Sequence, residues 1–361
     1  MDALLLAADT LDARLIAQTA LRHNIAVETV GVEEIASREP SESESMLVLT
    51  RRQDVDRLRH WGTNAHIVAT VDDHLTSWTD GNVTAENGEP PDVVVGMRVH
   101  AIRDDVTLAE VTHHPDSPAG HTNARRLAQQ LIDWKLPAVV AKRVPGQIMD
   151  RILYVLFLEA MRLHEEGIFS LQETDLLMMS LGRWCTGPFA YMDKLGLELV
   201  RNGMVHSYQQ RRQTPPPVPM LDNLIDRGAC GEHAGQGFYL HDAHGLLPAC
   251  TIDRQNFTLT PLLEGAIVAC AAKCDALDAA PTEHYALARL QCTLINEAAW
   301  IFDEGHARSD AIDLAWQGLG FAMGPLQWAD QIGHRTVRGV LLAMNDALGV
   351  ERYRSAKLFD A

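Results

Sequence analysis

The chain has 361 residues, enough for two or three domains, because a single hydrophobic core usually stops growing near about 250 residues. It contains 31 Lys and Arg against 48 Asp and Glu, and the formal net charge of −17 opposes binding to nucleic acids or anionic membranes. The first apolar run, residues 3–8, lacks the basic flank of a signal peptide, and no later run reaches membrane-spanning length. A cytoplasmic protein is expected.

Short apolar runs alternate with polar, helix-like runs through the first 146 residues. The helix-like runs include "LDARLIAQTALRH" (11–23) and "TNARRLAQQLIDW" (122–134). Alternation of this kind predicts an α/β domain on a largely parallel sheet. The strand candidates are "ALLLAA" (3–8), "VETVGV" (27–32), "MLVLT" (46–50), "HIVATV" (66–71), "VVVGM" (93–97), "LAEVTHH" (108–114) and "AVVAKRV" (138–144).

Beyond Pro145 and Gly146 the pattern changes to long amphipathic helices, the first within "IMDRILYVLFLEAMRLHEEG" (148–167). A domain boundary is therefore expected near residue 147. The proline-rich segment "RRQTPPPVPM" (211–220) predicts a stiff connector that does not continue a helix.

The helical part contains an internal duplication. The segments "FLEAMRLHEEG" (157–167) and "GPFAYMDKLG" (187–196) recur as "INEAAWIFDEG" (295–305) and "GPLQWADQIG" (324–333), with the same internal spacing. Each Gly-Pro predicts the end of one helix and the start of the next, with Asp193 or Asp330 available for local backbone hydrogen bonds. Two repeated helical units follow, at 147–245 and 246–361.

The six cysteines show no Cys-x-x-Cys spacing, and the histidines lack the spacing of metal ligands on a helix. Cys270 and Cys274 are expected one turn apart on a helix, as small apolar core residues. The sequence therefore predicts reduced thiols and no metal.

These residues resemble the 3-hydroxyacyl-CoA dehydrogenase family, in its long form with two C-terminal helical domains. The segments that match best are "VPGQIMDRIL" (144–153), "EAMRLHEEG" (159–167), "GPFAYMDKLG" (187–196) and "RGACGEHAGQGFYLH" (227–241), which matches the family's Gly-x-Gly-Phe-Tyr signature. The match is strong in the helical half and weak in the first 145 residues. It implies a truncated Rossmann-like domain at 1–146, followed by the two helical units.

Members of this family bind the pyrophosphate of NAD at a Gly-x-Gly-x-x-Gly turn. Here Ala7, Asp9 and Asp12 stand at the three glycine positions, and Gly31 stands near the position of the acid that holds the ribose. A carboxylate about 4 Å from a phosphate charge costs about 4 kcal/mol at an effective dielectric of 20. An aspartate that caps the first helix would equally occupy the positive helix end. No cofactor is expected.

The catalytic positions of the family are also replaced. The catalytic histidine aligns with Arg98, which has no acceptor nitrogen, while its carboxylate partner survives as Glu110. Arg98 and Glu110 are then expected to form a salt bridge. His100 lies on the same strand face as Arg98 and is the remaining candidate for a base. The family's polarising asparagine is Asp150, and its Asn-Thr-Ser loop is 71–73, Val-Asp-Asp.

The first hypothesis is a dehydrogenase-like protein that has lost NAD-dependent hydride transfer and acts as a partner subunit or binding protein. The alternative is an enzyme, with two forms. One is a cofactor-free reaction that uses Arg98, Glu110, Asp150 or His100; the other is an atypical NAD-dependent dehydrogenase of fatty or aromatic acyl-CoA metabolism. The partners left open are a small molecule or acyl-CoA and an active paralogue or other subunit. The twofold contact that single-unit relatives make between protomers could form inside this chain.

Overall fold

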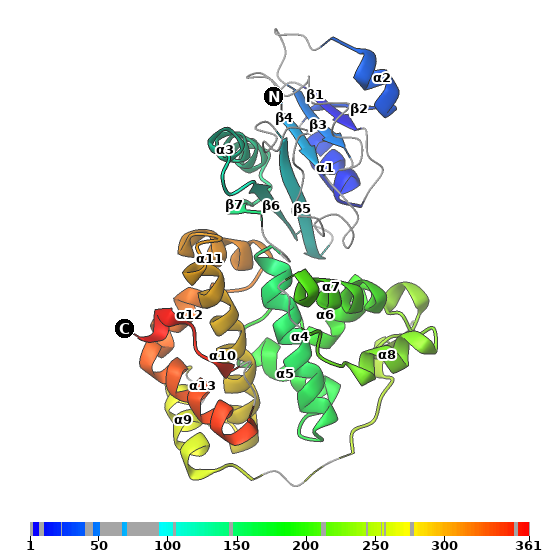
Figure 1. The fold of residues 1–361 in the computed structure, drawn as a ribbon. Helices are drawn as coiled ribbons and strands as arrows, with labels where there is room; N and C mark the ends of the chain where they lie inside the picture. The colour runs from blue at the N-terminus through cyan, green and yellow to red at the C-terminus, as the bar shows by residue number, and fades with distance from the viewer. Residues whose placement is uncertain are drawn as a thin grey trace. The chain divides into compact units, whose positions relative to one another are not determined.

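The computed structural model describes residues 3–6, 11–22, 24–39, 46–50, 67–70, 94–103, 106–143, 147–210, 214–242, 245–253, 255, 258–274, 278–349 and 353–360. The chain forms two compact units, Met1–Gln147 and Ile148–Ala361 (Figure 1). The further division of the helical part near residue 245 remains a prediction.

The first unit is built on a seven-stranded sheet in the order β2-β1-β3-β4-β5-β6-β7. Strands β1 to β5 are parallel, β6 runs antiparallel to β5, and β7 runs parallel to β6. The seven strands and the largely parallel sheet predicted from the sequence are confirmed. Their bounds are β1 Ala3–Leu6, β2 Ala26–Thr29, β3 Met46–Thr50, β4 Ile67–Thr70, β5 Val94–Arg103, β6 Val106–His113 and β7 Ala138–Lys142.

Three helices of this unit are described: α1 (Leu11–Arg22), α2 (Val32–Ser37) and α3 (Pro118–Asp133). The apolar residues of α1 and α3 join one face of the sheet in a single buried cluster that includes Ile16 and Leu127. Ser117 caps α3, since its Oγ accepts a hydrogen bond from the Gly120 backbone N–H at 2.8 Å. The sheet face that packs against α1 and α3 is hydrophobic. Side chains alternate along a strand, so polar side chains such as Arg98 and Glu110 lie on the opposite face.

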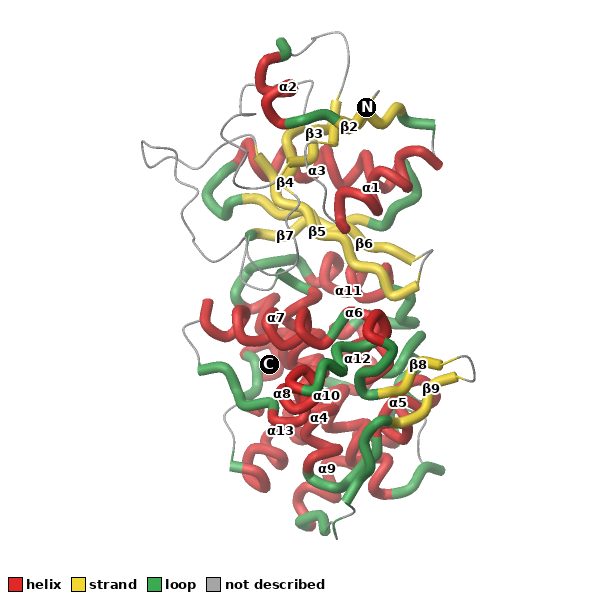
Figure 2. The backbone as a smooth tube through the Cα atoms, turned by 90° about the vertical axis from the view of Figure 1, so that its right-hand side faces the viewer, coloured by secondary structure: helices red, strands yellow, loops and turns green. Residues whose placement is uncertain are grey.

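The second unit is mainly helical, as expected. A short hairpin, β8 (Tyr239–Asp242) and β9 (Gly245–Pro248), is its only sheet among the described residues (Figure 2). Its helices are α4 Met149–Glu165, α5 Leu171–Ser180, α6 Pro188–Leu195, α7 Leu197–Gln210, α8 Pro219–Asp226, α9 Pro261–Ala271, α10 Pro281–Asp303, α11 Ser309–Gly318, α12 Pro325–Ile332 and α13 His334–Leu348, with short 3-10 turns at Glu232–Ala234 and Lys357–Asp360.

Both Gly-Pro pairs start a helix in the same way. Gly187 precedes α6, whose first N–H groups donate to Asp175 at 2.9 and 3.0 Å, and Gly324 precedes α12, whose first N–H groups donate to Asp313. A Cβ on either glycine would collide with the aspartate, so this cap requires glycine.

The predicted local bonds of the other two aspartates are wrong. Asp193 accepts hydrogen bonds from the Phe238 and Tyr239 backbone N–H groups, 45 and 46 residues away. Asp330 contacts the imidazole of His334 instead of the backbone. The reason is that residues 175 and 313 already satisfy the helix starts.

A reciprocal set of ion pairs joins α4 to α10, which lie side by side in Figure 1. Arg151 donates to Glu297 and Glu304, both at 2.7 Å. Arg289 donates in the opposite direction, to Glu159 at 2.8 Å and to both carboxylate oxygens of Glu166. Each residue of one set lies 138 positions from its counterpart in the other. The two helices therefore exchange equivalent contacts about a local twofold relation.

The thiols Cys270, Cys274 and Cys292 are buried, in keeping with core positions. Helix α9 ends at Ala271, so Cys274 lies in the turn after it, and the prediction that Cys270 and Cys274 share a helix is wrong. Within the part of the chain that the structure describes, no group of three or more His, Cys, Asp or Glu side chains is arranged to hold a metal ion. Each described helix is also too short or too polar to span a bilayer.

Candidate functional site

The crossover of the sheet defines where a nucleotide would bind. The chain passes from β1 to β2 on one side and then to β3 on the other, and ligands of open α/β sheets bind at the carboxyl ends of strands at such a switch point. β1 ends at Leu6 and α1 begins at Leu11. The turn that would meet the diphosphate contains Ala7 and Asp9, which lie outside the described residues.

Asp12 is the second residue of α1, so a carboxylate belongs to the first turn of this helix. The N-terminus of a helix attracts anions through its partial positive charge, and an acid in the first turn already uses that charge.

Gly31 lies two residues after the end of β2 and precedes α2, with φ −64° and ψ 145°. Any residue adopts this extended conformation, and a Cβ added at Gly31 would meet nothing within 4 Å. The backbone would therefore accept an acidic residue at position 31, so it does not require glycine there.

The residues that the family resemblance aligns with its catalytic positions lie on the polar face of the β5–β6 hairpin. Arg98 is the cross-strand partner of Glu110, and His100 pairs with Leu108 on the same face. Residues on the other face, including Met97 and Val111, belong to the aliphatic core. Strand alternation thus places Arg98, His100 and Glu110 together, as the sequence predicted.

His100 contacts the surviving carboxylate. Its Nε2 lies 3.2 Å from Glu110 Oε2, and the two side chains are 5% and 0% exposed. The sequence predicts a salt bridge between Arg98 and Glu110, which stays a prediction. The contact with His100 lies diagonally across the ladder. Arg98 is also buried and is the cross-strand partner of Glu110.

The hairpin therefore holds a histidine against a glutamate. His100 is not the residue that aligns with the family's catalytic histidine, because Arg98 stands at that position. Nε2 of His100 is engaged by Glu110, so proton exchange between this imidazole and a ligand would have to use Nδ1. Arg98 supplies a guanidinium that can bind an anion or polarise a carbonyl and cannot accept a proton.

Asp150 lies in the first turn of α4, in the second compact unit, and is half-buried. Its charge suits the positive end of that helix. Residues 71–73, the former Asn-Thr-Ser loop, lie outside the described residues.

The family signature at residues 227–241 forms a buried network with α5 and α6. Tyr239 Oη donates to Asp175 at 2.9 Å, and His241 Nε2 lies 2.9 Å from Asp193. Burial raises the pKa of Asp175 to about 6, against three hydrogen bonds that lower it, from the Phe189 and Ala190 N–H groups and from Tyr239. These residues hold the loop in place, and their chemistry is structural.

We expect Asp175 to make stability fall as pH rises. Its pKa is raised from 3.8 to about 6 on folding, so its contribution is fully present below about pH 4 and is lost by about pH 6, a change of about 3 kcal/mol. Urea unfolding of the wild type and D175N at pH 4 to 7 measures this. The wild-type free energy of unfolding should fall relative to D175N; a constant or rising difference would contradict the assignment.

A parallel α/β unit with a nucleotide-type switch point, followed by a helical unit, is the architecture of two-domain dehydrogenases. The model of the family described as 3-hydroxyacyl-CoA dehydrogenase, C-terminal domain, matches residues 146–241 and 285–361. The helical unit of this chain therefore matches the C-terminal domain of the 3-hydroxyacyl-CoA dehydrogenase family in two segments.

Individual relatives agree with this assignment. A probable 3-hydroxyacyl-CoA dehydrogenase of Caenorhabditis elegans is 31% identical over 139 residues, 37% of this chain and 43% of that protein. The mitochondrial hydroxyacyl-coenzyme A dehydrogenase of Mus musculus is 32% identical over 103 residues, 28% of this chain and 33% of that protein. The matches thus span less than half of these relatives.

The crystal structure of 3-hydroxybutyryl-CoA dehydrogenase from Escherichia coli has the same fold. Its TM-score is 0.69 at 16% identity, and the match covers 99% of this chain and 92% of that chain.

Proposed function

We propose that this protein does not transfer hydride to or from NAD, and that it acts as a non-catalytic subunit or binding protein in acyl-CoA metabolism. The observation that supports this best is the state of the former dyad. Arg98 stands opposite Glu110, and the neighbouring imidazole, His100, is buried with Nε2 on that carboxylate. Loss of a general base costs about 10²- to 10⁴-fold in rate.

The turn after β1 and the first turn of α1 support the same proposal, because their residues are expected to lower the affinity for NAD. The sequence from Ala7 to Asp12 has no glycine, and Asp12 belongs to the first turn of α1. Repulsion of about 4 kcal/mol is close to a thousandfold in affinity, which would move micromolar NAD binding into the millimolar range.

The helical unit can act as a binding protein or as a partner subunit. The corresponding ion pairs of α4 and α10 support an origin of this unit in two copies of one domain, which make within one chain the contact of a symmetric dimer. An acyl-CoA ligand, or an active family member as partner subunit, fits this role. A cytoplasmic location is part of the same proposal.

The contact of 3.2 Å between His100 and Glu110 favours a second candidate, an enzyme that moves a proton without a cofactor. In it Arg98 holds an anionic or carbonyl group of the ligand, while the contacting pair of His100 and Glu110 exchanges the proton. Glu110 keeps the imidazole oriented.

A turnover assay distinguishes the candidates. The purified chain is mixed with NADH and acetoacetyl-CoA, with an active 3-hydroxyacyl-CoA dehydrogenase as control, and NADH absorbance is followed. We expect no change above the enzyme-free rate. NADH consumption that H100A or E110A abolishes would contradict the proposal and establish an atypical dehydrogenase.

The cofactor-free candidate needs its own readout. Acetoacetyl-CoA is incubated in D2O, and deuterium exchange at C2 is followed by NMR for the wild type and H100A. Exchange at the buffer rate in both supports a binding role, whereas wild-type exchange that H100A removes would establish proton-transfer catalysis.

A further inference from the structure

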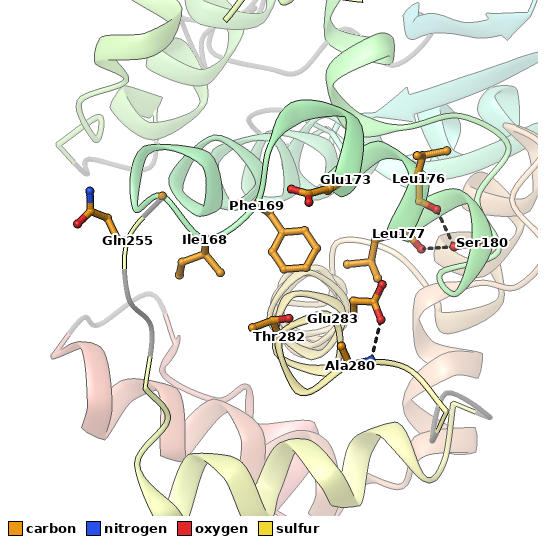
Figure 3. A pocket seen from close by; sticks show the side chains of 11 residues that line it. Ile168, Phe169, Glu173, Leu176, Leu177, Ser180, Gln255, Ala280, Thr282 and Glu283 are labelled. Carbon is orange, nitrogen blue, oxygen red and sulfur yellow. Dashed lines mark hydrogen bonds between the residues drawn. The ribbon is translucent and has the colours of Figure 1, made fainter. Parts of the chain in front are cut away.

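The helical unit contains a pocket of about 450 Å³ that lies away from Arg98, His100 and Glu110 in the sequence and includes none of the former dehydrogenase positions. The turn after α4 (Gly167–Phe169), the inner side of α5, Gln255 and the first residues of α10 form its walls (Figure 3). The volume lies within the range of small-molecule sites. We propose that this pocket binds an organic cation, a primary ammonium group on a short apolar chain.

The apolar part of the lining suits the chain of such a ligand. Ile168, Phe169 and Leu177 are 7%, 6% and 4% exposed and form a hydrophobic floor. Leu176, which precedes Leu177 in α5, is 64% exposed at the rim of the pocket. Figure 3 shows the Phe169 ring at the centre of the lining. An aromatic face also attracts a cation placed over it.

Two carboxylates provide the charge. Glu173 Oε2 accepts hydrogen bonds from the Ser170 backbone N–H and Oγ, both at 2.8 Å, and Glu283 Oε2 accepts one from the Ala280 N–H at 2.7 Å. These bonds fix both side chains at the ends of their helices, on different sides of Phe169 in Figure 3. Among the described residues that line the pocket, the charged side chains are these two acids, and both attract a cation.

The lining is particular to this half of the helical unit. The positions 138 residues after Phe169, Glu173 and Leu177 are alanines, at 307, 311 and 315. The helices pack in both halves, so packing alone does not require an aromatic ring, an acid and a leucine here.

The segment that contains Asp253 and Gln255, between the two halves of the helical unit, forms one wall of the pocket. The Gln255 backbone N–H donates to the Gly167 carbonyl at 3.1 Å, and Gly167 approaches Asp253 so closely that a Cβ would collide with it. Because Gly167 also has φ +71°, only glycine fits this contact easily. The wall is thus held at a fixed position beside the two glutamates.

Calorimetric titration of the full chain with n-hexylammonium, hexanol and hexanoate tests the proposal. E173Q and E283Q remove one charge each, and glutamine at the third helical position retains the backbone bond of a capping box. E264Q is the matched control, because Glu264 is exposed in the first turn of α9 and does not line the pocket. Circular dichroism verifies that all three variants are folded.

We expect hexylammonium to bind one to one, at least about tenfold more tightly than hexanol or hexanoate. E173Q and E283Q should each weaken it about fivefold without changing hexanol binding, and added salt should weaken it further. E264Q should leave it unchanged. Equal binding of the three probes, no hexylammonium binding up to millimolar concentration, or equal weakening by E264Q would overturn the proposal.

Discussion

Replacement of Arg289 by alanine is expected to lower the free energy of unfolding by about 3 to 5 kcal/mol. The Arg289 side chain is fully buried, and its Nε lies 2.8 Å from Glu159, which is 1% exposed. Removal of the guanidinium takes one of two cationic partners from this buried carboxylate, which keeps Arg162 and the Tyr353 hydroxyl, and it leaves an empty volume beside it. The loss of a buried ion pair and the new cavity both lower stability. Urea unfolding followed by tryptophan fluorescence measures the change.

R308A is the matched control for R289A. Arg308 also pairs with an acid, Asp310 at 2.9 Å, but it is 86% exposed, and exposed pairs contribute about 0 to 1 kcal/mol. R151A should resemble R289A, because Arg151 is 3% exposed and makes the equivalent bonds to Glu297 and Glu304. A loss below about 1 kcal/mol in R289A would show that these ion pairs do not hold the two long helices together.

Much of the fold could be predicted because its signals are local. Continuous aliphatic runs such as residues 46–50 and 138–142 are typical of buried parallel strands, and all seven predicted strands are present. The Gly-Pro pairs at 187 and 324 are also local signals. They predict helix starts, because proline fits the first position of a helix.

Contacts between distant segments could not be predicted in this way. Asp193 was assigned to local bonds, yet its partners are Phe238, Tyr239 and His241, which the chain brings back from more than 40 residues away. The bonds of Arg151 and Arg289 to glutamates span 123 to 153 residues. A signal for them existed, because Arg151 and Arg289 have the same separation as the glutamates of the duplicated segments.

The candidate site was predicted in part. Strand alternation placed Arg98, His100 and Glu110 on one face, and the structure agrees. Alternation cannot tell which side chain reaches the carboxylate, since that depends on side-chain length and the diagonal geometry of the hairpin. His100 is the residue whose contact with Glu110 the structure adds.

A large change in NAD affinity is expected from substitutions in the turn after β1. Restoring glycine with A7G/D9G/D12G removes two carboxylates and returns the three positions at which the family's diphosphate meets the backbone. Relief of about 4 kcal/mol of repulsion should tighten NAD binding by up to about a thousandfold. D133N, which changes an exposed acid at the end of α3, serves as the charge control and should leave NAD affinity unchanged.

Calorimetric titration of NAD into the wild-type chain and the triple-glycine variant tests the loss of the coenzyme most directly. The wild type should saturate only in the millimolar range or give no binding heat, and the variant should bind markedly more tightly. Micromolar binding of NAD to the wild type would contradict the proposal that this protein has lost its redox coenzyme.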